Sequence, residues 1–181
     1  MAYVGNMKYF IVTNGEKNPF PQITNFSQAI DIRKLTRDEY QKIPPYILLN
    51  VKLGLDGIFP DVIDKPALLL SRSAMEVTVL YDSDIPFLFF VLFDTRKGEC
   101  ASYFCPVLEE EDCLAGKSGP GQREIILDRK KMSGIPLFRV RTGMESATII
   151  RMDLAESLLE REIVGMELKE VRLTEGAESQ M

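Results

Sequence analysis

Short apolar stretches separated by turn-forming residues dominate the last third of the chain and predict a series of short strands. These stretches are residues 123–127, 137–141 and 147–151. The stretches between them, residues 128–134 and the surroundings of Gly143, are rich in turn-forming residues. Three strands joined by turns favour antiparallel pairing.

A helix is expected directly after these strands, from residue 154 to about residue 162. Asp153 precedes it as the N-cap residue, and Gly165 follows where a left-handed residue would end the helix. Residues 166–173 then alternate as a final strand. The apolar positions of the helix share one face, with arginine and glutamate opposite; they are Leu154, Ala155, Leu158 and Leu159.

The middle of the chain shows a similar order of elements. An apolar stretch at residues 67–70 precedes Ser71 and Ser73, either of which can cap a helix over residues 74–81. A strand at residues 87–93 follows. The two units are alike in pattern, which indicates either an internal duplication or two independent strand–helix–strand units.

An antiparallel partner for strand 87–93 is expected at residues 101–108, because the turn-forming residues 95–98 separate the two β-rich segments. The first segment extends an apolar run over residues 85–93 that is rich in phenylalanine. This composition predicts a central strand covered on both faces. The alternative is a strand that forms a dimer.

The first sixty residues give a weaker pattern. Residues 7–13 are a β-rich run and predict a first strand. Thr36 and Glu39 have the spacing of a capping box, which predicts a short helix over residues 37–42. Residues 46–53 form a further apolar element whose type the pattern leaves open.

These elements predict an α+β protein with a mostly antiparallel sheet and a few short helices packed against it. Residues 1–65 would form an N-terminal segment packed on a core domain of residues 66–173. A loop at residues 115–122, rich in glycine and serine, interrupts that domain. Residues 174–181 would be a mobile tail.

The absence of histidine among 181 residues excludes several kinds of chemistry, because histidine titrates nearest neutral pH and is the commonest metal ligand. Catalytic triads with histidine, Cys-His pairs and histidine-containing zinc sites are all excluded. We therefore expect a non-catalytic protein with no cofactor and no metal. An enzyme would have to use carboxylates or a thiol, gathered in a pocket with perturbed pKa values.

The net charge of −5 argues against nucleic acid and anionic membranes as partners, since both require basic surfaces, and would suit a basic protein partner. The longest apolar run is too short to span a bilayer. The first residues lack the basic-then-apolar order of a secretory signal, and three cysteines cannot all pair. We expect a cytoplasmic protein with reduced thiols.

Two short motifs resemble known sites without meeting their requirements. Gly116-Lys117-Ser118 would need a glycine five residues earlier to form a phosphate-binding loop, and Glu111 occupies that place. Cys100, Cys105 and Cys113 supply three thiols where a structural zinc site needs four ligands. Strand alternation places Cys100 and Cys105 on opposite faces, which favours isolated thiols.

A run of four acidic residues is the candidate partner-binding site. Its carboxylates would attract a basic partner through charge complementarity. The alternative is a solvated segment between two elements. The run comprises Glu109, Glu110, Glu111 and Asp112, and further carboxylates follow at Asp128, Glu167, Glu170, Glu175 and Glu178.

The block from residue 125 to residue 171 carries a series of paired positions: Leu127-Asp128, Phe138-Arg139, Ile149-Ile150, Leu154 to Leu159, and Gly165-Met166. In this order they resemble the C-terminal signature of bacterial immunity protein family eleven, once catalogued as a domain of unknown function. The resemblance extends upstream through residues 103–114 to residues 66–71, so it covers about residues 66–171.

The resemblance implies an α+β protein of a polymorphic toxin system that protects its producer by binding a cognate toxin. It implies no catalytic residues, in agreement with the missing histidine. The alternative is a structural or regulatory domain that self-associates, as a homodimer for example, through edge strands within residues 85–108. An enzyme that acts through carboxylates or a thiol is the third interpretation.

Overall fold

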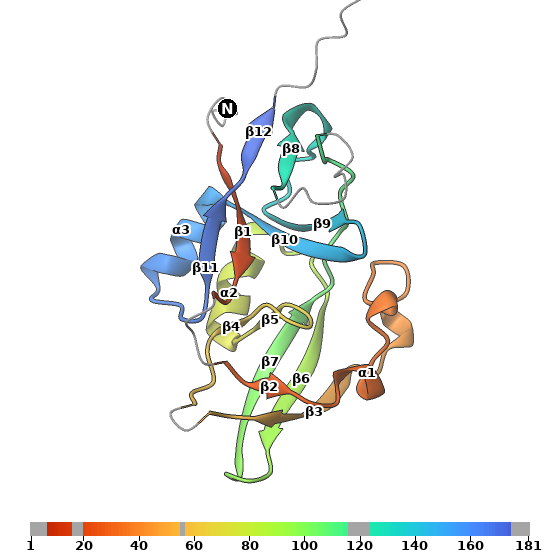
Figure 1. Ribbon diagram of the computed structural model, residues 1–181, viewed down its shortest axis with the longest axis vertical. Coiled ribbons are helices and arrows are strands. Elements are labelled where there is room, and N and C mark those ends of the chain that lie inside the picture. The colour runs from red at the N-terminus through yellow and green to blue at the C-terminus, as the bar shows by residue number, and fades with distance from the viewer. Residues whose placement is uncertain (1–6, 16–19, 55–56, 116–123, 175–181) are drawn as a thin grey trace, which may run out of the picture.

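The computed structural model describes residues 7–15, 20–54, 57–115 and 124–174 (Figure 1). The strands of this part of the chain are β1 (Tyr9–Thr13), β2 (Gln22–Ile23), β3 (Tyr46–Lys52), β4 (Val62–Ile63), β5 (Leu69–Leu70), β6 (Phe87–Asp94), β7 (Glu99–Pro106), β8 (Ile126–Asp128), β9 (Leu137–Thr142), β10 (Glu145–Arg151), β11 (Glu167–Glu170) and β12 (Arg172–Thr174). The α-helices are α1 (Phe26–Ala29), α2 (Arg72–Tyr81) and α3 (Met152–Glu160). Short 3-10 helices cover Ile32–Lys34, Tyr40–Lys42 and Arg129–Lys131.

The strands form two main sheets. One has the order β11-β1-β10-β9 and is antiparallel throughout. The other has the order β2-β3-β6-β7-β5-β4 and is antiparallel except for the parallel pair β3 and β6. β8 and β12 form a separate parallel pair. The predicted α+β class with mostly antiparallel pairing is confirmed.

The repeated order of elements extends to the topology. β5 and β6 lie on either side of β7 and are connected through α2, whereas β10 and β11 lie on either side of β1 and are connected through α3. Each unit is a split β-α-β unit, in which an antiparallel strand from outside the unit separates two parallel strands. In the first unit the inserted strand follows directly along the chain. In the second it comes from the N-terminal part.

Three apolar clusters hold these elements together. The first lies within residues 26–107 and buries one face of the six-stranded sheet, including Phe90 and Leu92. The second joins α2 and α3 to both sheets. The third packs Tyr9 and Phe138 with residues near β8 and β12. Residues 1–65 therefore contribute strands to both sheets: β1 to one, and β2, β3 and β4 to the other.

The helix in the middle of the chain forms as the sequence predicts. Ser71 is its N-cap residue, and the Ser71 hydroxyl accepts a hydrogen bond from the backbone N–H of Ala74 at 3.3 Å. The same hydroxyl donates to the carboxylate of Asp61 at 2.7 Å. That carboxylate also accepts from the backbone N–H of Val164 at 3.0 Å, so the helix start is tied to the segment that follows α3.

The predicted capping box at Thr36 and Glu39 is wrong. A turn leads into the 3-10 helix Tyr40–Lys42, and Glu39, its N-cap residue, makes no side-chain capping bond. The carboxylate of Glu39 instead pairs with the ammonium of Lys42 at 2.8 Å. A full positive charge three residues away competes well with a neutral backbone amide for a carboxylate.

The expected boundaries of the last helix and strand are also wrong. α3 begins at Met152, so Asp153 lies in its first turn, where the carboxylate pairs with Arg151 at 2.8 Å. The helix ends at Glu160, before Gly165. Residues 166–173 divide between β11 and β12, because pairing of β11 with β1 runs out near Tyr9 and the chain then pairs with β8.

The prediction that residues 85–93 are covered on both faces is wrong. Burial alternates along β6: Leu88, Phe90 and Leu92 are buried, and the residues between them are only partly buried. β6 lies between β3 and β7 and has no free edge. β7 pairs with β5 at Phe104 alone, so of the edge expected within residues 85–108 only the first part of β7 has no strand partner on its outer side in the described chain. The flanks of this sheet are formed by short β2 and β4, and β3 lies next to β2.

Asn14 connects the end of β1 to two distant segments. Its amide nitrogen donates to the carbonyl oxygens of Val62 at 2.8 Å and Gly165 at 2.7 Å. Its amide oxygen accepts from the backbone N–H of Asp64 at 2.7 Å. Asn14 is buried, and its side chain supplies a hydrogen-bond partner for each of these backbone groups.

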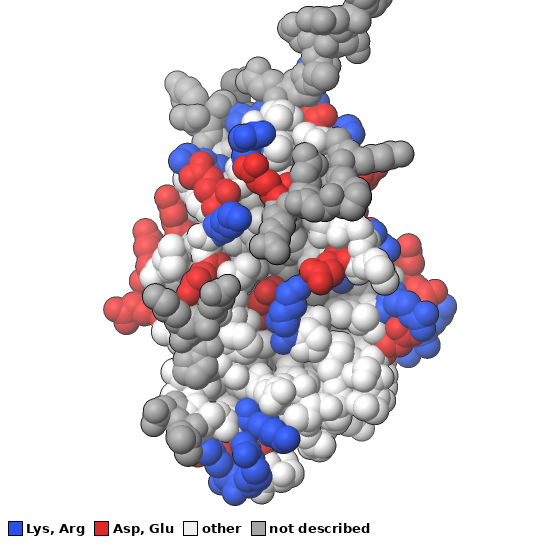
Figure 2. Space-filling view, in the orientation of Figure 1, with Lys and Arg blue, Asp and Glu red and all other residues white. Residues whose placement is uncertain are grey.

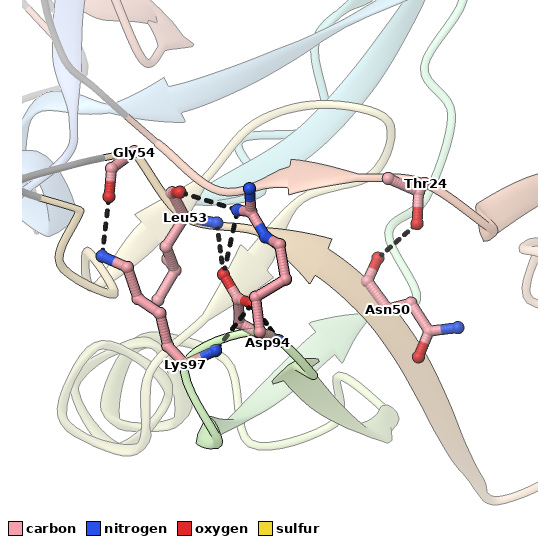
Figure 3. A network of polar contacts seen from close by, with 7 residues as sticks. Thr24, Asn50, Leu53, Gly54, Asp94 and Lys97 are labelled. Carbon is pink, nitrogen blue, oxygen red and sulfur yellow. Dashed lines mark hydrogen bonds and ion pairs between the residues drawn. The ribbon is translucent and has the colours of Figure 1, made fainter.

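Asp94 performs a similar role at the end of β6 (Figure 3). Its buried carboxylate accepts hydrogen bonds from the backbone N–H of Leu53 at 2.8 Å and of Arg96 at 2.9 Å, and pairs with the Arg96 guanidinium at 3.3 Å. Lys97 donates from its ammonium to the carbonyl oxygen of Gly54 at 2.7 Å. The network fixes the turn between β6 and β7 against the end of β3.

Acid is expected to weaken the fold through Asp94. The backbone N–H of Leu53, followed by the hydrogen bonds from Arg96 and Lys97, lowers the pKa of Asp94 from its ordinary value of 3.8 to about 2. A carboxyl with a lowered folded-state pKa stabilises the fold above its unfolded-state pKa and loses this contribution as the pH falls toward the folded-state value. Urea unfolding at pH 6, 4 and 2 should show this loss, and Asp94→Asn should be less stable at pH 6 with a flatter pH dependence. An equal pH dependence in both proteins would contradict the assignment.

Candidate interaction surface

The acidic run at residues 109–112 lies against β9. The backbone N–H of Arg139 donates to the carbonyl oxygen of Glu109 at 2.8 Å, and the backbone N–H of Glu111 donates to the carbonyl oxygen of Arg139 at 2.8 Å. Glu110 thereby forms a parallel bridge with Arg139. The run is part of the sheet margin as well as a source of negative charge.

Most of the carboxylates in this run have partners within the molecule. Glu110 accepts two hydrogen bonds from the guanidinium of Arg141, at 2.9 and 3.0 Å, and hydrogen bonding by Arg141 is the main reason for the lowered pKa of Glu110. Glu109 lies 3.9 Å from the guanidinium of Arg37.

Glu111 and Asp112 complete the run. Glu111 accepts from the backbone N–H of Ser133 at 3.3 Å and from the hydroxyl of the same residue, while partial burial raises the pKa of Glu111. Asp112 is exposed. The run therefore presents less unpaired negative charge than four consecutive acidic residues suggest.

A groove of about 400 Å³ lies next to Glu110. Its walls come from residues 32–36, 64–68, 106–110 and 139–148, so it lies between the margin of the six-stranded sheet and the β9–β10 hairpin. Only part of the wall is charged. The charged side chains are Arg33, Asp64, Lys65, Glu110, Arg139, Arg141 and Glu145.

Two charged groups of the groove are partly withdrawn from water. Burial raises the pKa of Asp64 and lowers the pKa of Arg139. The Nη2 atom of Arg139 donates to the carbonyl oxygen of Leu35 at 2.8 Å, whereas its Nε atom is buried without a hydrogen-bond partner in the part of the chain that the structure describes. A groove of this kind can bind polar groups of either charge.

A second acidic surface surrounds α3. Between Met152 and Glu170 the sequence carries six carboxylates and two cations, whereas the net charge of the whole chain is −5. Figure 2 shows acidic side chains gathered along the left edge of the molecule, where Figure 1 places α3. Four exposed carboxylates of this surface have no ion-pair partner within the described ranges: Glu156, Glu160, Glu162 and Glu167.

Exposed apolar side chains accompany these carboxylates. Leu159 on α3 is 51% exposed, and Val164, just after the helix, is 49% exposed. Leu80, on the neighbouring helix α2, is 75% exposed. The two helices touch, because the hydroxyl of Tyr81 donates to the carbonyl oxygen of Asp153 at 3.1 Å. We call the exposed carboxylates and these three apolar residues the α3 surface.

The cysteines are dispersed. Cys100 is exposed on β7, whereas Cys105 and Cys113 are buried, and burial raises their pKa values to about 12 and about 11. The expected placement of Cys100 and Cys105 on opposite strand faces is confirmed. Among the described residues, no three His, Cys, Asp or Glu side chains are arranged to hold a metal ion. Gly116-Lys117-Ser118 lies outside the described residues, as does most of the loop at residues 115–122 and of the tail at residues 174–181.

No family model and no curated protein matches the sequence. Within the described residues, the structure has no helix that is both long enough and apolar enough to cross a membrane.

Of the α3 surface, the sequence reasoning selected only Glu167 as a possible partner-binding residue and missed those of the helix itself. The signal was present, because Glu156 and Glu160 are four residues apart on the helix face opposite Leu154 and Leu158. The consecutive acidic residues at 109–112 were more conspicuous in the sequence. Their arginine partners lie tens of residues away, so the pairing was not evident from local pattern.

Proposed function

We propose that this protein is a non-catalytic immunity-type protein that binds and neutralises a bacterial toxin through the α3 surface. The observation that carries the proposal is the combination of exposed, unpaired carboxylates with exposed leucines on two adjoining helices. The resemblance of residues 66–171 to an immunity protein family supports the same function. A toxin partner would present basic side chains around an apolar centre.

The chemistry of this surface suits inhibition by masking. Apolar side chains such as Leu159 and Leu80 provide area that is buried on binding. Carboxylates around them accelerate encounter with a basic partner and disfavour acidic ones. Because this charge remains at the solvent-exposed margin, the affinity should fall as salt is raised.

Charge reversal on α3 is expected to weaken toxin binding by about tenfold or more, since each reversal turns attraction into repulsion. The variant is Glu156→Lys combined with Glu160→Lys, and the matched control is Glu99→Lys combined with Glu124→Lys, which makes the same change in net charge on other exposed carboxylates, outside both the α3 surface and the groove. The product of the adjacent gene serves as the toxin candidate. The dissociation constant of the complex between each variant and this candidate is measured at low and high salt. Protection by each variant is measured in cells that express the candidate toxin.

The outcome separates the α3 surface from the groove. Equal loss in the variant and in the control would show that only overall charge matters and would contradict the role of the α3 surface. Asp64→Asn, in the groove, is expected to leave both affinity and protection unchanged. If protection is lost in Asp64→Asn while affinity is retained, the groove has a chemical role, and the interpretation as a carboxylate-dependent enzyme gains support. No complex with the candidate would oppose the proposal.

A further inference from the structure

The flank of the six-stranded sheet is only partly covered at β3. β2 pairs with Val51 and Lys52 on the side of β3 that faces away from β6. On this outward side, the backbone N–H and C=O of Asn50 also have hydrogen-bond partners. The carbonyl oxygen of Asn50 accepts from the backbone N–H of Thr24 at 2.9 Å, and its N–H donates to the side chain of Asn25 at 2.7 Å. Coverage of this edge in the described chain ends at that residue.

The remaining outward groups belong to Tyr46 and Leu48. In a strand, alternate residues direct their N–H and C=O groups to the same side, so these two residues share the side of Asn50. The opposite side of β3 is paired with β6, as the hydrogen bond from the N–H of Phe89 to the carbonyl oxygen of Pro45 at 3.2 Å shows. Four backbone groups are left at an open edge: two N–H donors and two carbonyl acceptors.

The side chains at this edge are apolar and exposed. Tyr46 is 73% exposed and Leu48 is 59% exposed. The register places them next to Phe89 and Val91 on β6, whose side chains are only partly buried. Residues 46–49 carry no charge, although charged side chains are a common protection for sheet edges. Figure 2 shows that the surface over this part of the molecule carries few charged residues.

We propose that the open edge of β3 pairs with β3 of a second copy of this chain, antiparallel about a two-fold axis centred on Ile47. In this register Tyr46 of each copy lies opposite Leu48 of the other and exchanges two backbone hydrogen bonds with it. The four open groups of each strand are then all paired. Aromatic and aliphatic side chains meet on the outer face across the axis, which is a favourable cross-strand combination.

The neighbouring registers satisfy fewer groups. An axis centred on Leu48 would place Tyr46 opposite Asn50, whose outward groups are already occupied. An axis centred on Tyr46 would place Leu48 opposite Pro44, which has no N–H to donate. Of these three registers, only the one centred on Ile47 pairs all four open backbone groups of β3 with those of the second copy. A two-fold interface requires such self-complementarity.

Sedimentation of the full chain over a range of concentrations tests the proposal. A reversible dimer is expected for the unmodified protein, and Leu48→Lys is expected to raise its dissociation constant by about 100-fold, because the substitution enters the interface twice. Leu159→Lys, which alters a comparably exposed leucine on α3, should leave the dimer unchanged. A monomer at every concentration, or a dimer that Leu48→Lys does not affect, would overturn the proposal.

The register is tested by disulfide trapping in a Cys100→Ser background, because Cys105 and Cys113 are buried. A chain with both Tyr46→Cys and Leu48→Cys should form a covalent dimer on mild oxidation, since residues in a hydrogen-bonded pair have their Cα atoms about 5.5 Å apart. Leu48→Cys alone should not, because residue 48 does not face its own copy in this register. Trapping by Leu48→Cys alone, or no trapping by the double variant, would refute the register. Toxin binding by Leu48→Lys should persist, since the α3 surface is elsewhere on the molecule.

Discussion

Replacing Leu92 by lysine is expected to unfold the protein, whereas the same substitution at the adjacent Val91 leaves it folded. Leu92 is fully buried in the core within residues 26–107. A lysine there would place an unpaired ammonium group in an apolar environment, at a cost of at least about 4 kcal/mol. Val91 lies on the opposite face of β6, where a lysine can extend into water, and the expected cost is about 1 kcal/mol.

Circular dichroism and urea unfolding of the two variants measure this difference. The pair is matched in strand, position and introduced charge, so the comparison isolates the two faces of β6. Equal destabilisation would mean that both faces are covered in solution. That would restore the sequence-based interpretation of a doubly covered strand.

Asn14→Ala is expected to lower the free energy of unfolding by about 3 kcal/mol. The substitution leaves the carbonyl oxygens of Val62 and Gly165 and the N–H of Asp64 without their partner, and a buried group left unsatisfied costs about 1 to 3 kcal/mol. Some of this cost is recovered if water enters the space of the missing amide. The midpoint of urea unfolding, interpreted with an unchanged slope, gives the value.

Asn50→Ala is the control for this prediction. Asn50 is exposed on β3, and its backbone groups make the hydrogen bonds to Thr24 and Asn25. Its replacement should cost less than about 0.5 kcal/mol. A loss at Asn14 no larger than the loss at Asn50 would contradict the role assigned to the buried amide.

Elements that depend on neighbours in the sequence were predictable. The Ser71-capped helix, the β6–β7 pair and the β9–β10 hairpin follow from capping, alternation and turn residues, all of which act over a few positions. The placement of β1 was not predictable from the sequence, because its partners Arg151 and Glu170 come from the other end of the chain. The division of residues 166–173 into two strands has the same origin.

The candidate site shows the same limit. Net negative charge and the acidic run at residues 109–112 were visible in the sequence, but whether a carboxylate is available depends on which cation the fold brings to it. Arg141 reaches Glu110 from another strand, whereas Glu156 and Glu160 receive no such partner in the described structure. Helical periodicity could have identified the latter pair as exposed.

The position of β1 has a consequence for how the chain acquires its structure during synthesis. The strand leaves the ribosome before any other described strand, yet it belongs between β10 and β11, which are among the last. The core within residues 26–107 needs neither of them and can consolidate first. The newly made β1 is apolar and has no strand to pair with until nearly the whole chain has emerged. Completion of the four-stranded sheet is therefore expected to be the late, slow step of folding.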